Sequence, residues 1–525
     1  MLLSFIKRIF MIKLNGNSLT PSIVESIANG EKVCVDPFAM EKVKLAHSIL
    51  IKAALQGVKI YGLTVGVGLN KDQEWIDLNG KLTNEIIEKS VQFNINLLRA
   101  HSVGVGASIE KNIVRALIAI RLNNLLSAHS GIQPAIINSY IAFLNLDIIP
   151  VIPVVGSVGE ADITIISHVG LAMIGEGNVI YKGKQCIAID ALSDAKVPLI
   201  KPWAKDALSI LSSNAYSAAI ASLALAKMAR YLDINEIAYS LTLQSLNGNL
   251  SPFNELVLSV RPYDEVNAMG DKLRQLTSGS SLELSDPSRE LQDPLSFRCG
   301  VYILAALRKY YDEAYSQLYI QLNSSDDNPC VLLDNIDEAD YSDSVVPSAN
   351  FETLPWVLAL ENLQLALAHN GLSQVQQIIK FSDPRLTHLS RYLGADKTVH
   401  GLAALEKTAV SLGTQIKLLA YPVSLDYLPV SGGVEDIATN APLSADRLLA
   451  QILYSFDLLS ILLLYAAQAI DLRVQKNKML RLSPSALNLY SRIRDKVGFI
   501  EADRSLSTDL SVINQLITNW DRNCH

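Results

Sequence analysis

The chain has 525 residues, of which 49% are apolar and 18% charged, and its formal net charge is −7. The charges form neither a basic block nor an acidic tail, which argues against nucleic acid or an anionic membrane as the main partner and favours a small-molecule substrate. The length exceeds what one compact core usually holds, and the high apolar content favours an oligomer.

The cysteines are odd in number, scattered and without a CxxC pair. This pattern predicts reduced thiols in a cytoplasmic protein. The five are Cys34, Cys186, Cys299, Cys330 and Cys524. Residues 1–10 lack a normal apolar segment and a small-residue cleavage site, so we interpret them as an N-terminal extension and not as a signal peptide.

Residues 11–204 are predicted to form a mixed N-terminal part that carries the active-site loops. The apolar spacing predicts amphipathic helix over residues 21–57 and again over 82–145. Glycine-rich loops are expected at IYGLTVGVG (60–68) and at PVVGSVG (153–159). Residues 177–200 are the best candidate for a small strand pair.

From residue 205 the helical period dominates, which predicts a mainly α protein with an elongated bundle of long antiparallel helices. The expected division is 205–485 for this bundle and 486–525 for a C-terminal helical segment. The stretches 216–228 and 458–467 are so apolar that we expect them to pack in a core between subunits. The stretch 458–467 is too short to span a bilayer.

Several common site patterns are missing from the sequence. Gly66 and Gly68 lack the third glycine of a dinucleotide loop, there is no GK[ST] phosphate loop, and GSVG is not a GxSxG elbow. No His, Cys and carboxylate cluster has metal-ligand spacing. Neither a metal nor a nucleotide cofactor is therefore implied.

A set of polar residues remains, set in glycine-rich or proline-marked segments. Taken singly, each has an ordinary structural explanation, such as a packed phenol, a core histidine or a turn residue. The set consists of Tyr61, His101, Asn247, Gln292, Arg298, Asn328, Asn350, Lys417 and Glu435.

The words around these residues occur in the order and spacing of a known family. They include IYGLTVGVG, NLLRAHSVGVG, PVVGSVG, SLNGN, QDPLSFRC, DDNP, SANF and YPVSLDYLPVSGGVEDIAT. The chain resembles the histidine ammonia-lyase superfamily over roughly residues 11–480. The resemblance implies a helical homotetramer whose active sites combine loops from several subunits.

The resemblance also implies roles for individual residues. Tyr61 is the base that removes a β-hydrogen, and Arg298 grips the substrate carboxylate by a two-pronged contact. The pKa of such a base is expected to be lowered by neighbours that stabilise phenolate. Asn247 and Asn350 border the reacting centre. His101 stands where histidine-specific members contact the imidazole, and Glu435 where they place a carboxylate near the ring.

The chain departs from the family at the segment that builds its electrophilic cofactor. Members cyclise an Ala-Ser-Gly triplet directly after GSVG, whereas this chain has Glu160, Ala161 and Asp162 there. The loop is one residue shorter, so a methylidene-imidazolone is not expected to form by the usual route. Leu295 and Ile437 are further departures, in the QDPY and Gln-Glu-Asp-His words.

Without an electrophile the substrate must bring its own leaving group. One branch of the superfamily, the ergothionases, eliminates trimethylamine from ergothioneine to give thiourocanate. The preferred hypothesis is a cofactor-free lyase of this type, in which Lys407 joins His101 and Glu435 around a sulfur-bearing ring; Lys407 could equally be a solvated helix cation. The alternatives are an ammonia-lyase for histidine or an aromatic amino acid, and a catalytically inactive scaffold.

Overall fold

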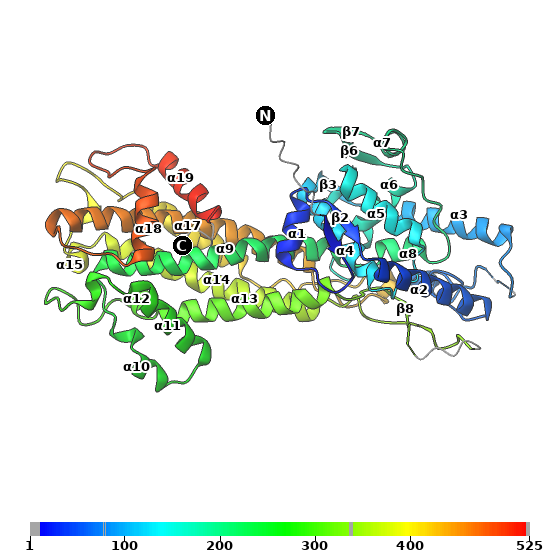
Figure 1. Cartoon of the computed structure of the whole chain (residues 1–525), viewed down its shortest axis with the longest axis horizontal. Helices are drawn as coiled ribbons and strands as arrows, with labels where there is room; N and C mark the ends of the chain where they lie inside the picture. The colour runs from blue at the N-terminus through cyan, green and yellow to red at the C-terminus, as the bar shows by residue number, and fades with distance from the viewer. Residues whose placement is uncertain (1–10, 77, 79, 335–339, 521–525) are drawn as a thin grey trace, which may run out of the picture. The chain divides into compact units, whose positions relative to one another are not determined.

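The structure is a computed structural model that describes residues 11–76, 78, 80–334 and 340–520. The extension expected at residues 1–10 and Cys524 lie outside the described residues. Figure 1 shows the elements along the chain. The α-helices are α1 (Pro21–Ala28), α2 (Pro37–Leu55), α3 (Asn84–His101), α4 (Lys111–Leu126), α5 (Pro134–Leu146), α6 (Ile163–Met173), α7 (Ala188–Ala195), α8 (Asp206–Leu211), α9 (Ala215–Leu246), α10 (Glu255–Ser259), α11 (Asp264–Thr277), α12 (Leu295–Arg298), α13 (Gly300–Leu322), α14 (Leu354–Phe381), α15 (Pro384–Thr387), α16 (Leu405–Leu419), α17 (Ala441–Lys476), α18 (Pro484–Arg494) and α19 (Ser507–Thr518).

The strands are short and the protein is mainly helical, as the sequence predicts. The strands are β1 (Ile12–Leu14), β2 (Val33–Val35), β3 (Val105–Ser108), β4 (Ile149–Pro150), β5 (Pro153–Val155), β6 (Asn178–Tyr181), β7 (Lys184–Ile187), β8 (Cys330–Val331) and β9 (Val345–Val346). Short 3-10 turns are η1 (Gly68–Asn70), η2 (Ser251–Phe253), η3 (Ser281–Glu283), η4 (Arg391–Leu393) and η5 (Ser431–Gly433).

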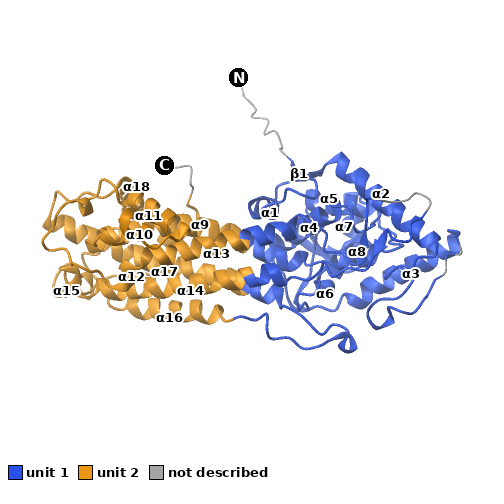
Figure 2. Cartoon of the chain, turned by 90° about the horizontal axis from the view of Figure 1, so that it is seen from below, with its two compact units in different colours: residues 1–223, 315–358, 422–446 blue, residues 224–314, 359–421, 447–525 orange. Residues whose placement is uncertain are grey.

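The chain folds into two compact units, each built from separate stretches of sequence (Figure 2). Unit 1 consists of residues 1–223, 315–358 and 422–446, and unit 2 of residues 224–314, 359–421 and 447–525. These boundaries differ from the contiguous divisions at 204 and 485, which stay predictions.

Unit 1 contains the mixed part of the protein. The strand pair expected within residues 177–200 is present as β6 and β7, which β4 extends to a three-stranded sheet. Residues 188–195 are helix α7 and not strand, which corrects that part of the prediction. The helix expected over 21–57 is interrupted, because Gly30 has a φ of +111° and strand β2 follows it before Asp36 caps α2.

The two aspartates of the DDNP segment belong to a buried ion cluster in unit 1. Arg121 on α4 donates to Asp326 and Asp327 at 3.0 Å each, and the Nζ of Lys205 lies 2.6 Å from Asp327. All four side chains are almost fully buried. Removing one partner from such a cluster leaves an uncompensated buried charge, so it fixes the DDNP segment against α4 and the start of α8.

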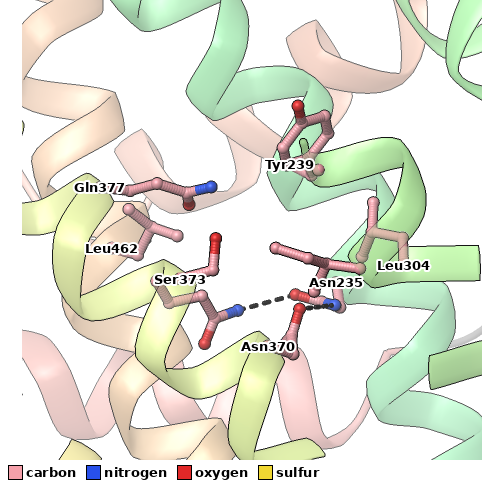
Figure 3. Close-up of a pocket in the computed structure, with 10 residues that line it drawn as sticks. Asn235, Tyr239, Leu304, Asn370, Ser373, Gln377 and Leu462 are labelled. Atoms are coloured by element: carbon pink, nitrogen blue, oxygen red, sulfur yellow. Dashed lines mark hydrogen bonds between the residues drawn. The ribbon is translucent and has the colours of Figure 1, made fainter. Parts of the chain in front are cut away.

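Unit 2 is a bundle of long helices with polar side chains inside it. Tyr231 and Asn235 on α9 form a closed ring of hydrogen bonds with Asn370 and Gln374 on α14, with distances of 2.8–3.3 Å. Figure 3 shows Asn235 and Asn370 in this ring beside a cavity of about 10 Å³. The cavity has room for about one water, so it serves packing and holds no substrate.

The apolar stretches 216–228 and 458–467 are buried within the single chain. Leu458, Leu463 and Ala467 are 0% exposed. The prediction that these stretches form a core between subunits is therefore wrong, because their apolar surface is already covered. By length and composition, residues 206–246 and helix α17 could each cross a membrane, but their most apolar windows are 100% and 72% buried, as in core helices of soluble proteins.

Candidate active site

Unit 1 encloses a cavity of about 820 Å³, a size that suits a small-molecule site. The cavity brings together Tyr61, His101 and Glu435, which are far apart in the sequence, and adds Glu160 and Ala161 from the loop after GSVG. Further lining residues are Lys59, Lys71, Asp72, Ser212, Asn328 and Phe351.

Tyr61 is held by a tight turn that begins at Ile60. The Ile60 N–H donates to Thr64 Oγ1 at 2.7 Å, and the Tyr61 hydroxyl accepts from the Gly68 N–H at 2.8 Å. Gly62 has a φ of +75°, and a Cβ there would meet Leu208 at 2.5 Å, so this turn requires glycine. The glycine-rich loop expected from the sequence is confirmed, and it aims the phenol into the cavity.

The protonation of Tyr61 differs from the expectation. Burial raises the pKa of Tyr61, the Gly68 N–H opposes that rise, and the Glu435 carboxylate adds to it. A lowered pKa was expected for the base, and in the free protein the direction is the opposite. A phenolate at this position therefore needs positive charge nearby.

His101 ends helix α3 and contributes a ring to the cavity wall. Its Nδ1 lies 2.9 Å from the Leu97 carbonyl oxygen, which can only accept. Nδ1 therefore carries the hydrogen, and in the neutral ring Nε2 is left as an acceptor toward a ligand.

Glu435 lies in a short turn at η5. Its Oε1 accepts from the Ser431 hydroxyl at 2.6 Å, and a backbone bridge joins Val430 to Glu435. These contacts hold the carboxylate in place at the cavity wall.

The segment that replaces the cofactor triplet is held rigidly from behind. The Ala161 N–H donates to Asn214 Oδ1 at 3.0 Å, and Ala161 has a left-handed φ of +63°. Asp162 is fully buried and accepts from Ser157 Oγ at 2.5 Å and from the N–H and hydroxyl of Ser217 at 2.9 and 2.8 Å. Burial raises the pKa of Asp162 to about 6, although these hydrogen bonds oppose the rise.

This segment does not fit the family's cofactor. Cyclisation of Ala-Ser-Gly requires a serine to lose its hydroxyl, and neither Glu160, Ala161 nor Asp162 carries one. The Asp162 N–H is also bonded to the Ser213 carbonyl at 2.6 Å. The described fold accommodates the segment as ordinary backbone.

Glu160 is the ionisable residue of this segment that lines the cavity. Burial raises its pKa to about 8, and the carboxylates of Glu352 and Glu435 add to the rise. Its Oε1 is shielded from solvent and has no hydrogen-bond partner among the described residues. From the sequence, Glu160 is expected only to replace part of the triplet. Its place directly after GSVG is the signal that could have identified it as a site residue.

Six of the expected site residues do not line this cavity, and two of them, Gln292 and Lys417, are exposed side chains of unit 2. Asn350 is exposed in the loop before α14, next to Phe351, which does line the cavity. Asn247 belongs to unit 2, has a φ of +66°, and bonds to Asp286 at 2.7 Å and to Arg289 at 3.3 Å. Arg298 ends α12 in unit 2 and donates to Gln292 Oε1 at 2.5 Å. Lys407 is exposed on α16, also in unit 2.

No group of three or more metal-ligating side chains occurs among the residues that the structure describes. The wall of the cavity carries a phenol, an imidazole and three carboxylates, those of Asp72, Glu160 and Glu435. Such a set can move a proton and hold a cationic ligand.

The chain is similar to known proteins over nearly its whole length. Residues 19–495 match the aromatic amino acid lyase family. The histidine ammonia-lyase of Geobacillus thermodenitrificans is 30% identical over 518 residues, which is 96% of each chain. The crystal structure of ergothionase from Treponema denticola, in complex with desmethyl-ergothioneine sulfonic acid, matches with a TM-score of 0.86 and 34% identity, over 97% of this chain and 98% of that one. Histidine ammonia-lyase from Trypanosoma cruzi shares the fold, with a TM-score of 0.85, 24% identity and coverage of 97% and 93%.

Proposed function

The chain belongs to the aromatic amino acid lyase family, and on that premise we propose that it eliminates trimethylamine from the betaine ergothioneine to give thiourocanate. Its relatives include histidine ammonia-lyases, and like them it is a carbon–nitrogen lyase. The proposal is carried by one observation. Where the family's electrophile would form, the cavity wall presents the carboxylate of Glu160.

A carboxylate cannot activate an amine as an electrophile does, so the leaving group must already be competent. A quaternary ammonium is such a group. Tyr61 takes the β-proton, the electrons of that C–H bond form the carbon–carbon double bond, and the C–N bond breaks with its electron pair going to nitrogen. The cationic substrate also favours the phenolate form of Tyr61, which the free protein disfavours.

The proposal also gives roles to the other expected site residues. His101 Nε2 and the carboxylate of Glu435 contact the thio-imidazole ring, and Arg298 holds the substrate carboxylate. We assign Asn247 and Lys407 to the same site through a homotetramer, in which unit 2 of one chain supplies residues to the cavity of another. Asn350 belongs to unit 1, and we assign it to the site through the loop that it shares with Phe351. The proposed setting is cytoplasmic.

The likeness to ergothionase supports this choice of substrate, since the identity of 34% extends over nearly the whole of both chains. Histidine ammonia-lyase is the second candidate, on the 30% identity with the Geobacillus enzyme. An inactive scaffold is the third, and the retained Tyr61 turn and Arg298 speak against it.

A substrate panel separates the three. Ergothioneine, histidine, phenylalanine and tyrosine are each incubated with the protein, and products are identified by mass spectrometry. We expect trimethylamine and thiourocanate from ergothioneine alone. Ammonia from histidine, with ergothioneine inert, would establish the second candidate, and no product from any of them the third.

Intact-mass spectrometry tests the proposal independently of substrate. We expect the mass of the unmodified chain, because the segment 159–163 has no serine to dehydrate. Loss of two waters located in that segment would contradict the cofactor-free mechanism.

A further inference from the structure

The cavity of unit 1 contains one carboxylate that the described fold leaves unpaired. The lining lysines have carboxylates of their own: Lys59 lies 2.5 Å from Glu74, and Lys71 lies 2.7 Å from Asp72. Glu435 accepts from Ser431. Glu160 Oε1, in contrast, is shielded from water without a hydrogen-bond partner among the described residues.

Within the single chain, the groups that act on Glu160 make its surroundings negative. The carboxylates of Glu352, just before α14, and of Glu435, at η5, both act on it. Tyr61 and His101 line the same cavity and are not fixed cations, and the charges of Lys59 and Lys71 are offset as described. A half-buried carboxylate among other carboxylates is stabilised by a cation that enters the cavity.

The aromatic residues Tyr61 and Phe351 line the cavity together with Glu160. Ring faces attract quaternary ammonium groups, which cannot donate hydrogen bonds and gain from a surface that is both aromatic and negative.

We propose that Glu160 is the residue that binds the cationic ammonium of the substrate, the group that leaves in the reaction. This inference rests on the proposed function for the identity of the leaving group, and it adds a binding role for a residue at the position of the missing electrophile. Glu435 serves the ring end of the substrate, so the two carboxylates divide the ligand between them.

Two ligands that differ in the ammonium group measure its contribution to binding. The N,N,N-trimethyl betaine of histidine has the ammonium group, and imidazolepropionate has the same ring and carboxylate but no ammonium group. Dissociation constants of both are measured by calorimetry at pH 9 in the full-length Tyr61→Phe protein, in which no proton can be taken. We expect the betaine to bind at least about tenfold more tightly, because a charged contact contributes about 1.5–3 kcal/mol.

Glu160→Gln in the same background should remove this preference, while Glu435→Gln should keep the preference and weaken both ligands. Folding of Glu160→Gln is checked by its melting temperature, which should equal or exceed that of the parent at pH 9. The reason is that the pKa of Glu160 is raised to about 8 in the folded protein, so its ionisation above that pH destabilises the fold. A preference that survives in Glu160→Gln would overturn the inference.

Proton release gives a second readout. A bound cation lowers the pKa of Glu160, so at pH 7 betaine binding should release protons, seen as a binding enthalpy that varies with the ionisation enthalpy of the buffer. Glu160→Gln should lose that dependence, and an unchanged dependence would contradict the role of Glu160. Because no turnover is measured, an inert ergothioneine combined with a Glu160-dependent ammonium preference would reject the proposed function and leave this inference standing.

Discussion

At the scale of single residues, burial raises the pKa values of both Tyr61 and Glu160, so the free protein holds both groups toward their neutral forms. In the proposed reaction the substrate is a cationic betaine, and its positive charge would favour the ionised forms of both residues. The proposed base and the proposed ammonium contact would then both gain their charge when the substrate binds.

Tyr61→Phe tests the base. We expect kcat to fall by about 10²–10⁴-fold, the usual contribution of a positioned base. The dissociation constant of the betaine should change by less than about tenfold, because one hydrogen-bonding group worth about 1 kcal/mol is lost. Tyr341→Phe is the matched control, since its hydroxyl contacts Lys52 outside the cavity and its loss should leave kcat unchanged. Retained turnover in Tyr61→Phe would assign the base to another group.

Asp162→Asn tests how the replaced triplet is anchored. The pKa of Asp162 is raised from 3.8 to about 6 by burial, so the folded protein holds a proton there between about pH 4 and 6 that the unfolded chain releases. Its contribution to stability is present at low pH and is lost as the pH rises through 6. The melting temperature of the wild type minus that of Asp162→Asn should therefore increase as the pH is lowered from 7 to 4. An exposed control, Asp194→Asn, should lack this trend, and a difference independent of pH would show that Asp162 does not titrate in the range.

Sequence alone identified the wall of the cavity but not its electrostatics. Tyr61, His101 and Glu435 could be named because they lie in words with a fixed order along the chain. The raised pKa of Tyr61 and the unpaired Glu160 could not, because both depend on burial and on side chains such as Glu352 that lie almost 200 positions further along the chain.

At the scale of elements, the loop at 159–162 is shaped by close backbone contacts. Gly159 has a φ of +93°, and a Cβ at this position would meet the Ala441 N–H nitrogen at 2.5 Å. The Gly159 carbonyl accepts from Thr353 at 3.0 Å. The loop thus rests directly on the start of α17 and on the residue before α14.

Gly159→Ala tests this contact against a matched glycine. Gly177 has a φ of +73°, and a Cβ added there would meet nothing within 4 Å, so Gly177→Ala carries the backbone strain of about 1–2 kcal/mol without a clash. Gly159→Ala adds overpacking of about 1–3 kcal/mol and displaces Glu160. We expect a larger fall in melting temperature and a loss of activity for Gly159→Ala only. Equal effects in calorimetry and turnover would show that the loop tolerates movement.

The helices that sequence predicted best are those with several turns of one period. Helices α3 and α4 lie within the predicted stretch 82–145, and α5 ends one residue beyond it. Strands β6 and β7 lie within the predicted stretch 177–200. The helix α7 was missed because its eight residues follow directly on β7 and give too few turns for a helical period to show. The parallel pair of β1 and β2 was missed for the same reason, since each has three residues.

At the scale of the whole molecule, the three most exposed leucines of the described residues lie in two of the loops that carry site words. Leu425 and Leu428, before Glu435, are 85% and 83% exposed, and Leu291, before Arg298, is 86% exposed. Exposed leucines beside a site are candidates for contact with another chain. The expectation of an oligomer therefore depends on these exposed leucines and not on the stretch 458–467, which is buried within the chain.

Introducing charge into the loop before Glu435 tests whether this loop lies in the interface between chains. Leu425→Asp combined with Leu428→Asp should reduce the proposed tetramer to smaller species in light scattering, because a charge is not tolerated at a buried apolar contact. Leu256→Asp, at a side chain that is 78% exposed on the short helix α10, is the control and should leave the mass unchanged. A double variant that keeps the wild-type mass would exclude this loop from the interface.

Complementation between inactive variants tests whether one site draws on two chains. Tyr61→Phe damages unit 1 and Arg298→Met damages unit 2, so each homotetramer should be inactive. If Tyr61 and Arg298 of one site come from different chains, random co-assembly leaves a site intact when a chain with Tyr61 meets a chain with Arg298, which happens in about one quarter of the sites. Co-expressed variants, purified through two different tags and assayed with ergothioneine, should then recover about that fraction of wild-type kcat. If both residues come from the same chain, no combination of these two variants contains an intact site, and the mixed tetramers would stay as inactive as their parents.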